Sequence, residues 1–341
     1  MKVLHLMAGA RHGGAETCFQ DTALALARCG LDQQAAIRAQ GERASALRLG
    51  GVPTLELGFG NLWLDFLTKR GIARLIHDYR PDIVMAWMQR AAAFVPKGDF
   101  VAVGWLGGFY DLKHYRRCQH LVGMSEAMRR HIQAGGIPAE HAHVLRALAR
   151  EESAPPVPRA AHATPEEAPL LLALGRLHEA KAFDVLLAAL TDLPGVYLWI
   201  AGEGPLRGAL EQLAATLGLI DRVRFLGWRN DRASLLAAAD LCVFPSRYEP
   251  FGIVSIEAWA NRVALVAAAS VGPADLIRNG EDGLLVPIDD AAALASAIRR
   301  TLAEPELRRR LIEAGYRRFR AEFTEAAVVQ SYQAFFREIT R

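Results

Sequence analysis

The sequence predicts an α/β fold with two domains, each built on a parallel sheet that carries helices on both faces. Short apolar runs of strand length alternate with segments of helix length along most of the 341 residues. This alternation is typical of parallel sheets. A polar stretch rich in Pro and Ala interrupts it at residues 151–169. A chain this long exceeds one ordinary core and suffices for two domains of about 150 to 170 residues.

The first half opens with a buried strand, a Gly-rich loop and a helix. The apolar residues after that loop recur at helical spacing, and so do those of a later segment that ends before a proline. The expected strands are Val3–Met7, Gln34–Arg38, Pro53–Leu57, Asp82–Ala86, Phe100–Trp105 and His120–Met124. The expected helices are Ala15–Cys29, Glu42–Leu49 and Leu62–Tyr79.

The second half repeats the alternation after the Pro-rich stretch. Its expected strands are Leu170–Leu174, Tyr197–Ala201, Val223–Leu226, Leu241–Phe244 and Ala264–Ala267. Its expected helices are Phe183–Thr191, Leu206–Leu217, Arg232–Ala239 and Ile253–Asn261, followed by a helical, Arg-rich end over 304–341. We therefore predict a first domain over 1–150, a linker over 151–169 and a second domain over 170–320.

Composition points to a globular protein of a reducing compartment. Apolar residues make up 52% of the chain and charged residues 23%, so both domains can bury a core. The four cysteines are scattered without a CxxC pair, which argues against disulfide frameworks and zinc sites and fits the cytoplasm. No apolar run approaches 18 residues, and the start of the chain is expected to be a strand rather than a signal peptide.

Charge is divided unevenly between the two halves. Residues 1–150 hold 19 Lys and Arg against 12 Asp and Glu, whereas residues 151–341 hold 21 against 25. A basic half beside an acidic half predicts that the two domains face different partners, although uneven surface solvation would give the same pattern.

The run from Phe244 to Glu257 is the most informative stretch of the chain. It joins an apolar strand to a helix through a turn, with Glu249 in the turn and Glu257 in the second turn of the helix. Backbone amides at a helix N-terminus lack intrahelical partners and attract anions. This element could therefore hold a phosphate, with a carboxylate on each side to bind hydroxyl groups, which is the shape of a nucleotide sugar.

Three other loops follow expected strands of the second half. Leu174–Lys181 carries Arg176 and Lys181, which could both reach a diphosphate beside Gly175. Gly202–Pro205 and Phe225–Gly227 follow the next two strands. Taken singly, each loop could equally be a charged surface or an ordinary turn. The carboxyl ends of parallel strands lie at one edge of a sheet, so all four loops should converge there.

In this order the four loops resemble those of the family 4 retaining glycosyltransferases, which have the GT-B fold. The motifs that carry the resemblance are Gly202-x-Gly204, the Pro-Ser-x-x-Glu-Pro-Phe-Gly run Pro245–Gly252, Glu257, the run Gly280–Pro287 and the N-terminal loop Gly13–Glu16. The resemblance implies two Rossmann-like domains facing each other across a cleft. It also implies that the final helix, 321–341, crosses back to the first domain.

The resemblance implies a role for each matching residue. Arg176 and Lys181 would bind the donor phosphates and stabilise the leaving nucleoside diphosphate, with Glu249 on the donor sugar as a third catalytic residue. Glu257 would bind the ribose hydroxyls. The remaining donor-binding residues are glycines and the residues whose amides face the sugar and phosphates: Gly14, Gly175, Gly202, Gly204, Phe251, Gly252, Ile253 and Val254.

We expect neither a metal nor another cofactor. The second half offers no Asp-x-Asp motif on a loop, and Asp289-Asp290 precedes a helix, which is typical of a helix cap. Two cationic side chains could replace a metal at the departing phosphate.

The acceptor side matches the family less well. The place where family members often have His-Gly reads Trp105–Phe109 here, and Arg146–Ala149 replaces the usual Asn-Gly-Val-Asp. Asp111 and His114 are candidate acceptor residues, although surface positions would explain both. The basic runs Lys113–Arg117 and Arg129–His131 could attract an anionic membrane or glycan, although a solvated helix face would explain them as well. Nothing favours nucleic acid.

The sequence thus predicts a metal-independent hexosyltransferase. It would move a sugar from a nucleotide-diphosphate donor, expected to be UDP-linked, to a glycan or lipid-linked acceptor of lipopolysaccharide or surface polysaccharide. It would act in the cytoplasm or at the inner face of the membrane. Four alternatives remain: a sugar-nucleotide epimerase of the same fold, an inactive sugar-nucleotide-binding subunit, a phosphorylase, and a glycosidase that uses Glu249 and Glu257.

Overall fold

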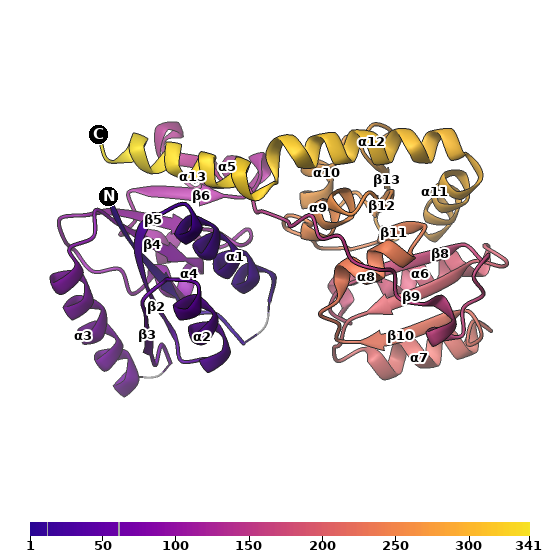
Figure 1. The fold of residues 1–341 in the computed structure, drawn as a ribbon, viewed down its shortest axis with the longest axis horizontal. Coiled ribbons are helices and arrows are strands. Elements are labelled where there is room, and N and C mark those ends of the chain that lie inside the picture. Colours follow the sequence, from indigo (N-terminus) through magenta and orange to yellow (C-terminus); the bar gives the residue numbers. More distant parts are fainter. Residues whose placement is uncertain (12, 61) are drawn as a thin grey trace. The chain divides into compact units, whose positions relative to one another are not determined.

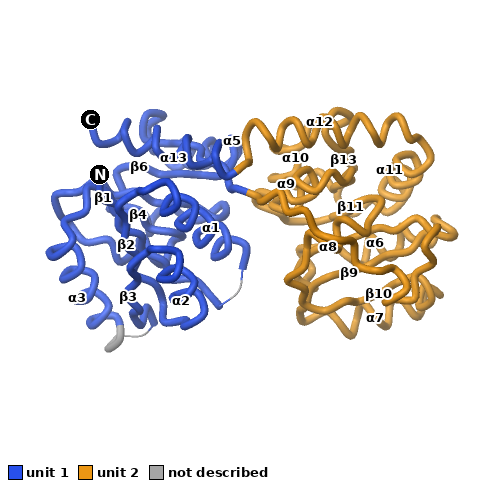
Figure 2. The backbone as a smooth tube through the Cα atoms, in the orientation of Figure 1, with its two compact units in different colours: residues 1–148, 325–341 blue, residues 149–324 orange. Residues whose placement is uncertain are grey.

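The computed structural model describes residues 1–11, 13–60 and 62–341, and for residues 62–64 it describes the backbone alone. The chain forms two compact units (Figure 2). Unit 1 comprises residues 1–148 and 325–341, and unit 2 comprises residues 149–324. Both are α/β units with parallel sheets, as the alternation of strands and helices predicts.

The sheet of unit 1 has the strand order β3-β2-β1-β4-β5-β6-β7, and every pair in it is parallel. Its strands are β1 (Lys2–Met7), β2 (Asp32–Arg38), β3 (Thr54–Leu57), β4 (Ile83–Trp87), β5 (Val101–Trp105), β6 (His120–Gly123) and β7 (Ala142–Val144). Its helices are α1 (Gly14–Arg28), α2 (Gly41–Leu49), α3 (Leu62–Tyr79), α4 (Met88–Ala92), α5 (Glu126–Ala134) and α13 (Glu325–Ile339), with 3-10 turns η1 (Leu112–Tyr115) and η2 (Ala139–His141).

Helix α13 returns the end of the chain to unit 1, where it lies along α1 (Figure 1). Its buried residues recur every three or four positions, so one apolar stripe faces the unit: Val328, Val329, Tyr332, Phe335 and Phe336. Arg28 at the end of α1 donates two hydrogen bonds to the carboxylate of Glu325 (2.7 and 2.5 Å), which ties the start of α13 to the same helix.

The sheet of unit 2 has the strand order β10-β9-β8-β11-β12-β13, again parallel throughout. Its strands are β8 (Leu170–Leu174), β9 (Tyr197–Ala201), β10 (Val223–Gly227), β11 (Leu241–Phe244), β12 (Leu265–Ala268) and β13 (Leu284–Val286). Its helices are α6 (Phe183–Thr191), α7 (Arg207–Thr216), α8 (Arg232–Ala238), α9 (Ile253–Ala260), α10 (Val271–Leu276), α11 (Ala291–Ala303) and α12 (Pro305–Glu322), with 3-10 turns η3 (Arg159–His162) and η4 (Glu179–Lys181).

The central strands β8 and β11 are buried at every position. Such continuous burial requires helices on both faces of the sheet, because a half-exposed strand would alternate between buried and exposed residues. The order of strands reverses between β8 and β11: β9 and β10 lie on one side of β8, and the later strands lie beyond β11. Loops at the carboxyl ends of strands flanking such a reversal form the usual ligand site of an open α/β sheet.

Residues 151–169, for which we predicted a linker, cluster with unit 2. The segment contains η3, and the guanidinium of Arg159 bonds the carbonyl oxygens of Glu166, Ala168 and Ala238 and the carboxylate of Asp240. Asp240 precedes β11 and also accepts from the N–H of Leu170 (2.8 Å) at the start of β8. Arg159 therefore fastens this segment to the amino edge of the second sheet.

Candidate active site

Main-chain hydrogen bonds join three loops at the carboxyl edge of the second sheet. The N–H of Gly175, after β8, donates to the carbonyl oxygen of Ala201 at the end of β9 (3.1 Å). The N–H of Gly202 donates in turn to the carbonyl oxygen of Gly227 at the end of β10 (2.8 Å). These bonds extend the sheet ladder past the strands, so the loops start from fixed positions.

Gly202 can only be glycine in this arrangement. Its φ is +156°, and a Cβ added to it would lie 1.8 Å from the carbonyl oxygen of Gly175. A Cβ on Gly204 would lie 2.3 Å from the carbonyl oxygen of Leu177, whose N–H bonds the carbonyl oxygen of Glu203 (3.0 Å). The Gly202-x-Gly204 motif is thus explained by the close approach of two backbone segments.

Lys181 and Glu249 form an ion pair between Nζ and Oε2. Lys181 ends η4, and Glu249 lies in the loop between β11 and α9. The lysine stem lies against Gly175, where an added Cβ would be 3.4 Å from Cε. The two side chains are 24% and 14% exposed, so the pair is partly withdrawn from solvent yet within reach of a ligand.

Arg176 follows Gly175 on the same loop and is exposed. Within the described part of the chain its side chain has neither a hydrogen bond nor an ion pair. Its backbone nitrogen is 3.6 Å from where a Cβ of Gly202 would stand. The backbone of Arg176 therefore runs beside the glycines that join the loops after β8 and β9, and its side chain is exposed.

Helix α9 begins at Ile253, and the φ of +96° at the preceding Gly252 is left-handed and strained for any other residue. Among the described residues no side chain caps this helix, so the N–H groups of Ile253 and Val254 remain available to an anion. Phe251 is buried, whereas Ile253 and Val254 are partly exposed. The carbonyl oxygen of Glu249 accepts from the N–H of Gly272 in α10 (2.8 Å), which fixes the loop in front of the helix.

Glu257 lies one turn further along α9, as the sequence predicts. Its Oε1 accepts from Nη1 of Arg232 at the start of α8 (2.7 Å), and the side chain is 20% exposed. The carboxylate is therefore held by a cation from the neighbouring helix.

Arg247 lies two residues before Glu249 and connects three segments of unit 2. Its guanidinium donates to both oxygens of Asp184 in the first turn of α6 (3.0 and 2.6 Å), to Asp289 (2.5 Å) and to the carbonyl oxygen of Glu179 (3.1 Å). Burial alone would raise the pKa of Asp184, but the hydrogen bonds and charge of Arg247 lower it below its ordinary value.

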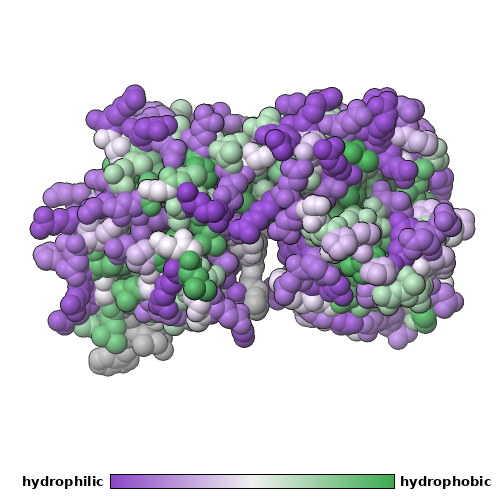
Figure 3. All heavy atoms as spheres, viewed as in Figure 1, coloured by the Kyte–Doolittle hydropathy of each residue, from purple (hydrophilic) through white to green (hydrophobic). Residues whose placement is uncertain are grey.

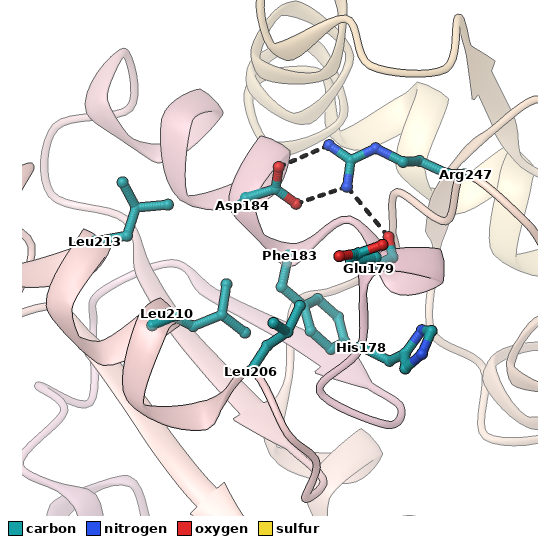
Figure 4. Close-up of a pocket in the computed structure, with 9 residues that line it drawn as sticks. His178, Glu179, Phe183, Asp184, Leu206, Leu210, Leu213 and Arg247 are labelled. Atoms are coloured by element: carbon teal, nitrogen blue, oxygen red, sulfur yellow. Dashed lines mark hydrogen bonds and ion pairs between the residues drawn. The ribbon is translucent and has the colours of Figure 1, made fainter.

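Figure 4 shows the pocket beside this ion pair. The pocket has a volume of about 230 Å³. The Arg247–Asp184 pair and η4 form its polar wall, and leucines of α7 form the apolar wall. Its residues are His178, Glu179, Phe183, Asp184, Leu206, Ala209, Leu210, Leu213 and Arg247. The pocket therefore lies between the segment that leads to Lys181 and helix α7.

The expected residues of the first half lie in unit 1. Gly14 is the first residue of α1, after a loop in which the N–H of Ala10 donates to Glu16 (2.7 Å). Asp111 caps η1 by accepting from the N–H of Lys113 (2.9 Å) and pairs with the ammonium group of Lys113 (2.7 Å). These bonds lower the pKa of Asp111. His114 is exposed on the same turn.

The sequence assigned no role to Arg247, Asp184 or Arg232. Arg247 lies inside the Pro245–Gly252 run, and its position two residues before the loop carboxylate was the one available signal. Its partners come from segments 63 and 42 positions away, which no local pattern reveals. Asp290 caps α11, as predicted, by accepting from the N–H of Ala293 (2.8 Å). The described residues contain no group of three His, Cys, Asp or Glu side chains placed to hold a metal.

Comparison with known proteins shows where this architecture recurs. The family model for glycosyl transferases group 1 matches residues 157–318. Two lipopolysaccharide core biosynthesis glycosyltransferases of Rhizobium meliloti, LpsE and LpsD, are 36% and 35% identical to the chain, covering 97% and 98% of it and 98% of each relative. Among solved structures, Anabaena HepE in complex with UDP superposes with a TM-score of 0.86 at 22% identity, covering 99% of this chain and all of that one.

A GT-B fold and an identity above 30% along nearly the whole chain agree with the motifs of the second unit. The chain therefore belongs to the glycosyl transferases group 1 family and is a glycosyltransferase.

Proposed function

We propose that this glycosyltransferase transfers a hexose, with retention of configuration, from a UDP-linked donor held by unit 2. The observation that carries the proposal is the meeting of Lys181, Glu249 and the uncapped start of α9 at one edge of the sheet. A cation, a carboxylate and unpaired amides match a diphosphate joined to a sugar. The UDP bound by Anabaena HepE supports the choice of base.

The chemistry requires charge stabilisation at the leaving group. As the bond between the anomeric carbon and the phosphate oxygen breaks, negative charge develops on the diphosphate. Arg176 and Lys181 would meet that charge, and fixed cations there lower the barrier. The acceptor oxygen forms its bond on the same face of the sugar, and its proton passes to the departing phosphate oxygen. No separate base is needed in this step, and the two side chains take the place of a metal ion.

The two glutamates would orient the donor. Glu249 would accept hydrogen bonds from neighbouring hydroxyls of the sugar, and Glu257, held by Arg232, those of the ribose. A carboxylate suits both places because its two oxygens can serve adjacent hydroxyl groups. In unit 1 the role of Gly14 at the donor remains a prediction, as do those of Asp111 and His114 at the acceptor.

The acceptor we propose is a lipopolysaccharide core or a related lipid-linked glycan. The support is the pair of Rhizobium relatives, which are lipopolysaccharide core glycosyltransferases and match along almost their whole length. Such an acceptor would bring the enzyme to the cytoplasmic face of a membrane. Among the described residues no helix is long and apolar enough to cross a bilayer.

Helix α3 of unit 1 has the chemistry to touch that membrane surface. Phe66 and Leu67 are 65% and 61% exposed, and the exposed Lys69 and Arg70 follow them on the next turn. Figure 3 shows hydrophobic surface around the lower end of α3 in that view. Apolar side chains beside cations favour an anionic interface, where rings insert among lipids and cations meet phosphates. We propose peripheral membrane binding through this face, assisted by the basic run Lys113–Arg117.

A panel of nucleotide sugars tests the proposed function. UDP, UDP-glucose, UDP-galactose, UDP-N-acetylglucosamine and GDP-mannose would each be added to the full chain while thermal unfolding is followed. A true donor raises the melting temperature with increasing occupancy. We expect stabilisation by UDP and by one UDP-sugar, together with slow release of UDP from that sugar. A protein that none of them stabilises, or that releases sugar from glycans without a nucleotide, would contradict the proposal.

A further inference from the structure

We propose that Arg247 is a positioning residue of the transfer reaction, because it holds Lys181 and Glu249 at the separation that the donor needs. This inference rests on the proposed function, in which those two residues contact the donor. It assigns a task to a side chain that does not itself touch the substrate.

The contacts of Arg247 show what it connects. The residue lies two positions before Glu249, and its Nη1 bonds the carbonyl oxygen of Glu179, two positions before Lys181 (3.1 Å). One residue further along each segment, the N–H of Tyr248 donates to the carbonyl oxygen of Ala180 (3.2 Å). Two successive links thus lead to the ion pair, and together they fix the two segments side by side.

Two carboxylates hold the guanidinium itself. Asp184 receives both terminal nitrogens at 3.0 and 2.6 Å, and Asp289 receives Nε at 2.5 Å. Figure 4 shows Arg247 reaching from its own loop to Asp184 on α6 and to Glu179. Asp184 lies in the first turn of α6 and Asp289 precedes α11, so both anchors lie on or beside helices of the core. The side chain therefore braces the loop between β11 and α9 against α6 and the segment before α11.

Only an arginine can make all four contacts. Its planar fork offers five donors in fixed directions, whereas an ammonium group is a single point charge on a flexible stem. A lysine at position 247 could bond one of the carboxylates. It could not also make the two parallel bonds to Asp184, the bond to Asp289 and the bond to the carbonyl oxygen of Glu179. Losing the brace would let the loop with Glu249 shift, and shifts of about 1 Å at reacting groups cost about a hundredfold in rate.

Arg159 supplies a matched control in the same unit. It too binds an aspartate, Asp240, and several carbonyl oxygens, but at the amino edge of the sheet. Arg247→Gln and Arg159→Gln each remove a multiply bonded guanidinium that ties a loop to other segments of unit 2. We expect both variants to lower the melting temperature, and only Arg247→Gln to lower kcat, by about tenfold or more. Arg247→Lys should recover part of kcat.

The experiment measures UDP release from the UDP-sugar that the panel identifies, in wild type, Arg247→Gln, Arg159→Gln, Glu249→Ala and the double variant Arg247→Gln/Glu249→Ala. A residue that acts through Glu249 and Lys181 should matter less once Glu249 is gone, so the two effects on kcat should not add. If Arg247 were purely structural, the fold loss of kcat in the double variant would equal the product of the losses in the two single variants.

Two results would overturn the inference: an Arg247→Gln variant whose kcat matches that of Arg159→Gln, or full additivity with Glu249→Ala. Failure of the proposed function would give a different result: Glu249→Ala would then turn over at the rate of wild type. A sharp loss in Glu249→Ala with none in Arg247→Gln would leave the site standing and remove only the brace.

Discussion

The ammonium group of Lys181 donates a hydrogen bond to the carboxylate of Glu249, so the side chain proposed for the donor phosphates is bonded to the one proposed for the donor sugar. The pair spans two loops, one after β8 and one after β11. A bound diphosphate would offer Lys181 a stronger anion than Glu249, and the sugar hydroxyls would replace Lys181 as the hydrogen-bond donors to Glu249. The two charges thus satisfy each other within the protein, and a donor would exchange that bond for two bonds of its own.

The first prediction concerns the charged residues of this site. Glu249→Ala and Arg176→Ala should each lower kcat/KM for the donor by about tenfold or more, because each removes a group aimed at charge or hydroxyls in the transition state. Circular dichroism and thermal unfolding would establish that the fold is kept. Glu211→Ala removes an exposed carboxylate of α7 in the same unit and should leave turnover unchanged. Wild-type rates in both site variants would remove the assignment.

A second prediction compares two glycines of unit 2. Gly202→Ala would bring a methyl group against the carbonyl oxygen of Gly175, so the loops after β8 and β9 must separate. We expect the free energy of unfolding to fall by about 2 kcal/mol or more and nucleotide stabilisation to weaken. Gly208→Ala, in α7, meets nothing within 4 Å, so it should leave nucleotide stabilisation unchanged and raise the free energy of unfolding by up to about 1 kcal/mol. Urea titration with and without UDP would measure both; equal stability of the two variants would contradict the steric argument.

How far the sequence predicts this structure depends on the range of the interactions. The strands β8, β9 and β11 and the helices α3 and α6 coincide with their predicted bounds, because apolar runs and helical spacing are local signals. The short elements α4, α5, β7 and β13 were not predicted. A strand of three residues such as β13, or a helix of five such as α4, carries too few positions for a period to be visible.

The candidate site divides in the same way. Motifs such as Gly202-x-Gly204 and Glu249 to Gly252 could be read from the chain, since each lies within a few consecutive residues. The pairing of Glu257 with Arg232 and the partners of Arg247 could not, because they depend on how helices pack across the sheet. The prediction of a linker at 151–169 was based on proline content. Proline content indicates a loop, but it does not reveal which part of the fold the loop packs against.

Metal removal provides a third prediction. Because Arg176 and Lys181 are proposed to stabilise the leaving diphosphate, exhaustive dialysis against a chelator should leave UDP release unchanged. The rate would be measured before dialysis, after it and after addition of Mg²⁺ or Mn²⁺. A rate that collapses on chelation and returns with either ion would show that the cations of the protein do not suffice.

A fourth prediction concerns acid stability of unit 1. Burial, and then the neighbouring His143 and His141, lower the pKa of His120 to about 4, and burial lowers that of His5 to about 4. Their ordinary value is 6.5. As pH falls below 6.5, the unfolded chain takes up these protons first, so the free energy of unfolding should decrease towards pH 4. The loss should be absent above 6.5.

Denaturant titrations from pH 8 to 4.5 would measure this slope. His120→Gln removes one titrating ring from the cluster, where Nδ1 of His120 lies 3.0 Å from Nε2 of His143. The slope for this variant should be shallower than for wild type. Stability that stays flat or increases on acidification would show that these histidines are not held neutral.

The last prediction tests the membrane face of α3. The full chain should co-sediment with vesicles rich in phosphatidylglycerol and not with pure phosphatidylcholine, and high salt should weaken binding. Phe66→Ser/Leu67→Ser and Lys69→Gln/Arg70→Gln should each reduce the bound fraction severalfold, since each removes one of the two attractions.

Controls for this experiment come from unit 2. Ile220→Ser removes another exposed apolar residue, and Arg310→Gln/Arg317→Gln removes two exposed cations of α12. Both should bind like wild type. Wild-type chain that stays in the supernatant at low salt would dismiss the proposal. So would a dimer in solution that the Phe66→Ser/Leu67→Ser change dissociates, because the face would then belong to a second copy.

The main-chain bonds that run from Gly175 to Ala201 and from Gly202 to Gly227 leave the shape of this edge independent of the neighbouring side chains. Positions 203 and 228, exposed beside Gly202 and Gly227, can exchange charge, length or aromatic character without shifting the frame beneath them. Single substitutions at this rim would therefore change the surface that a ligand meets, while the backbone platform beneath it stays the same.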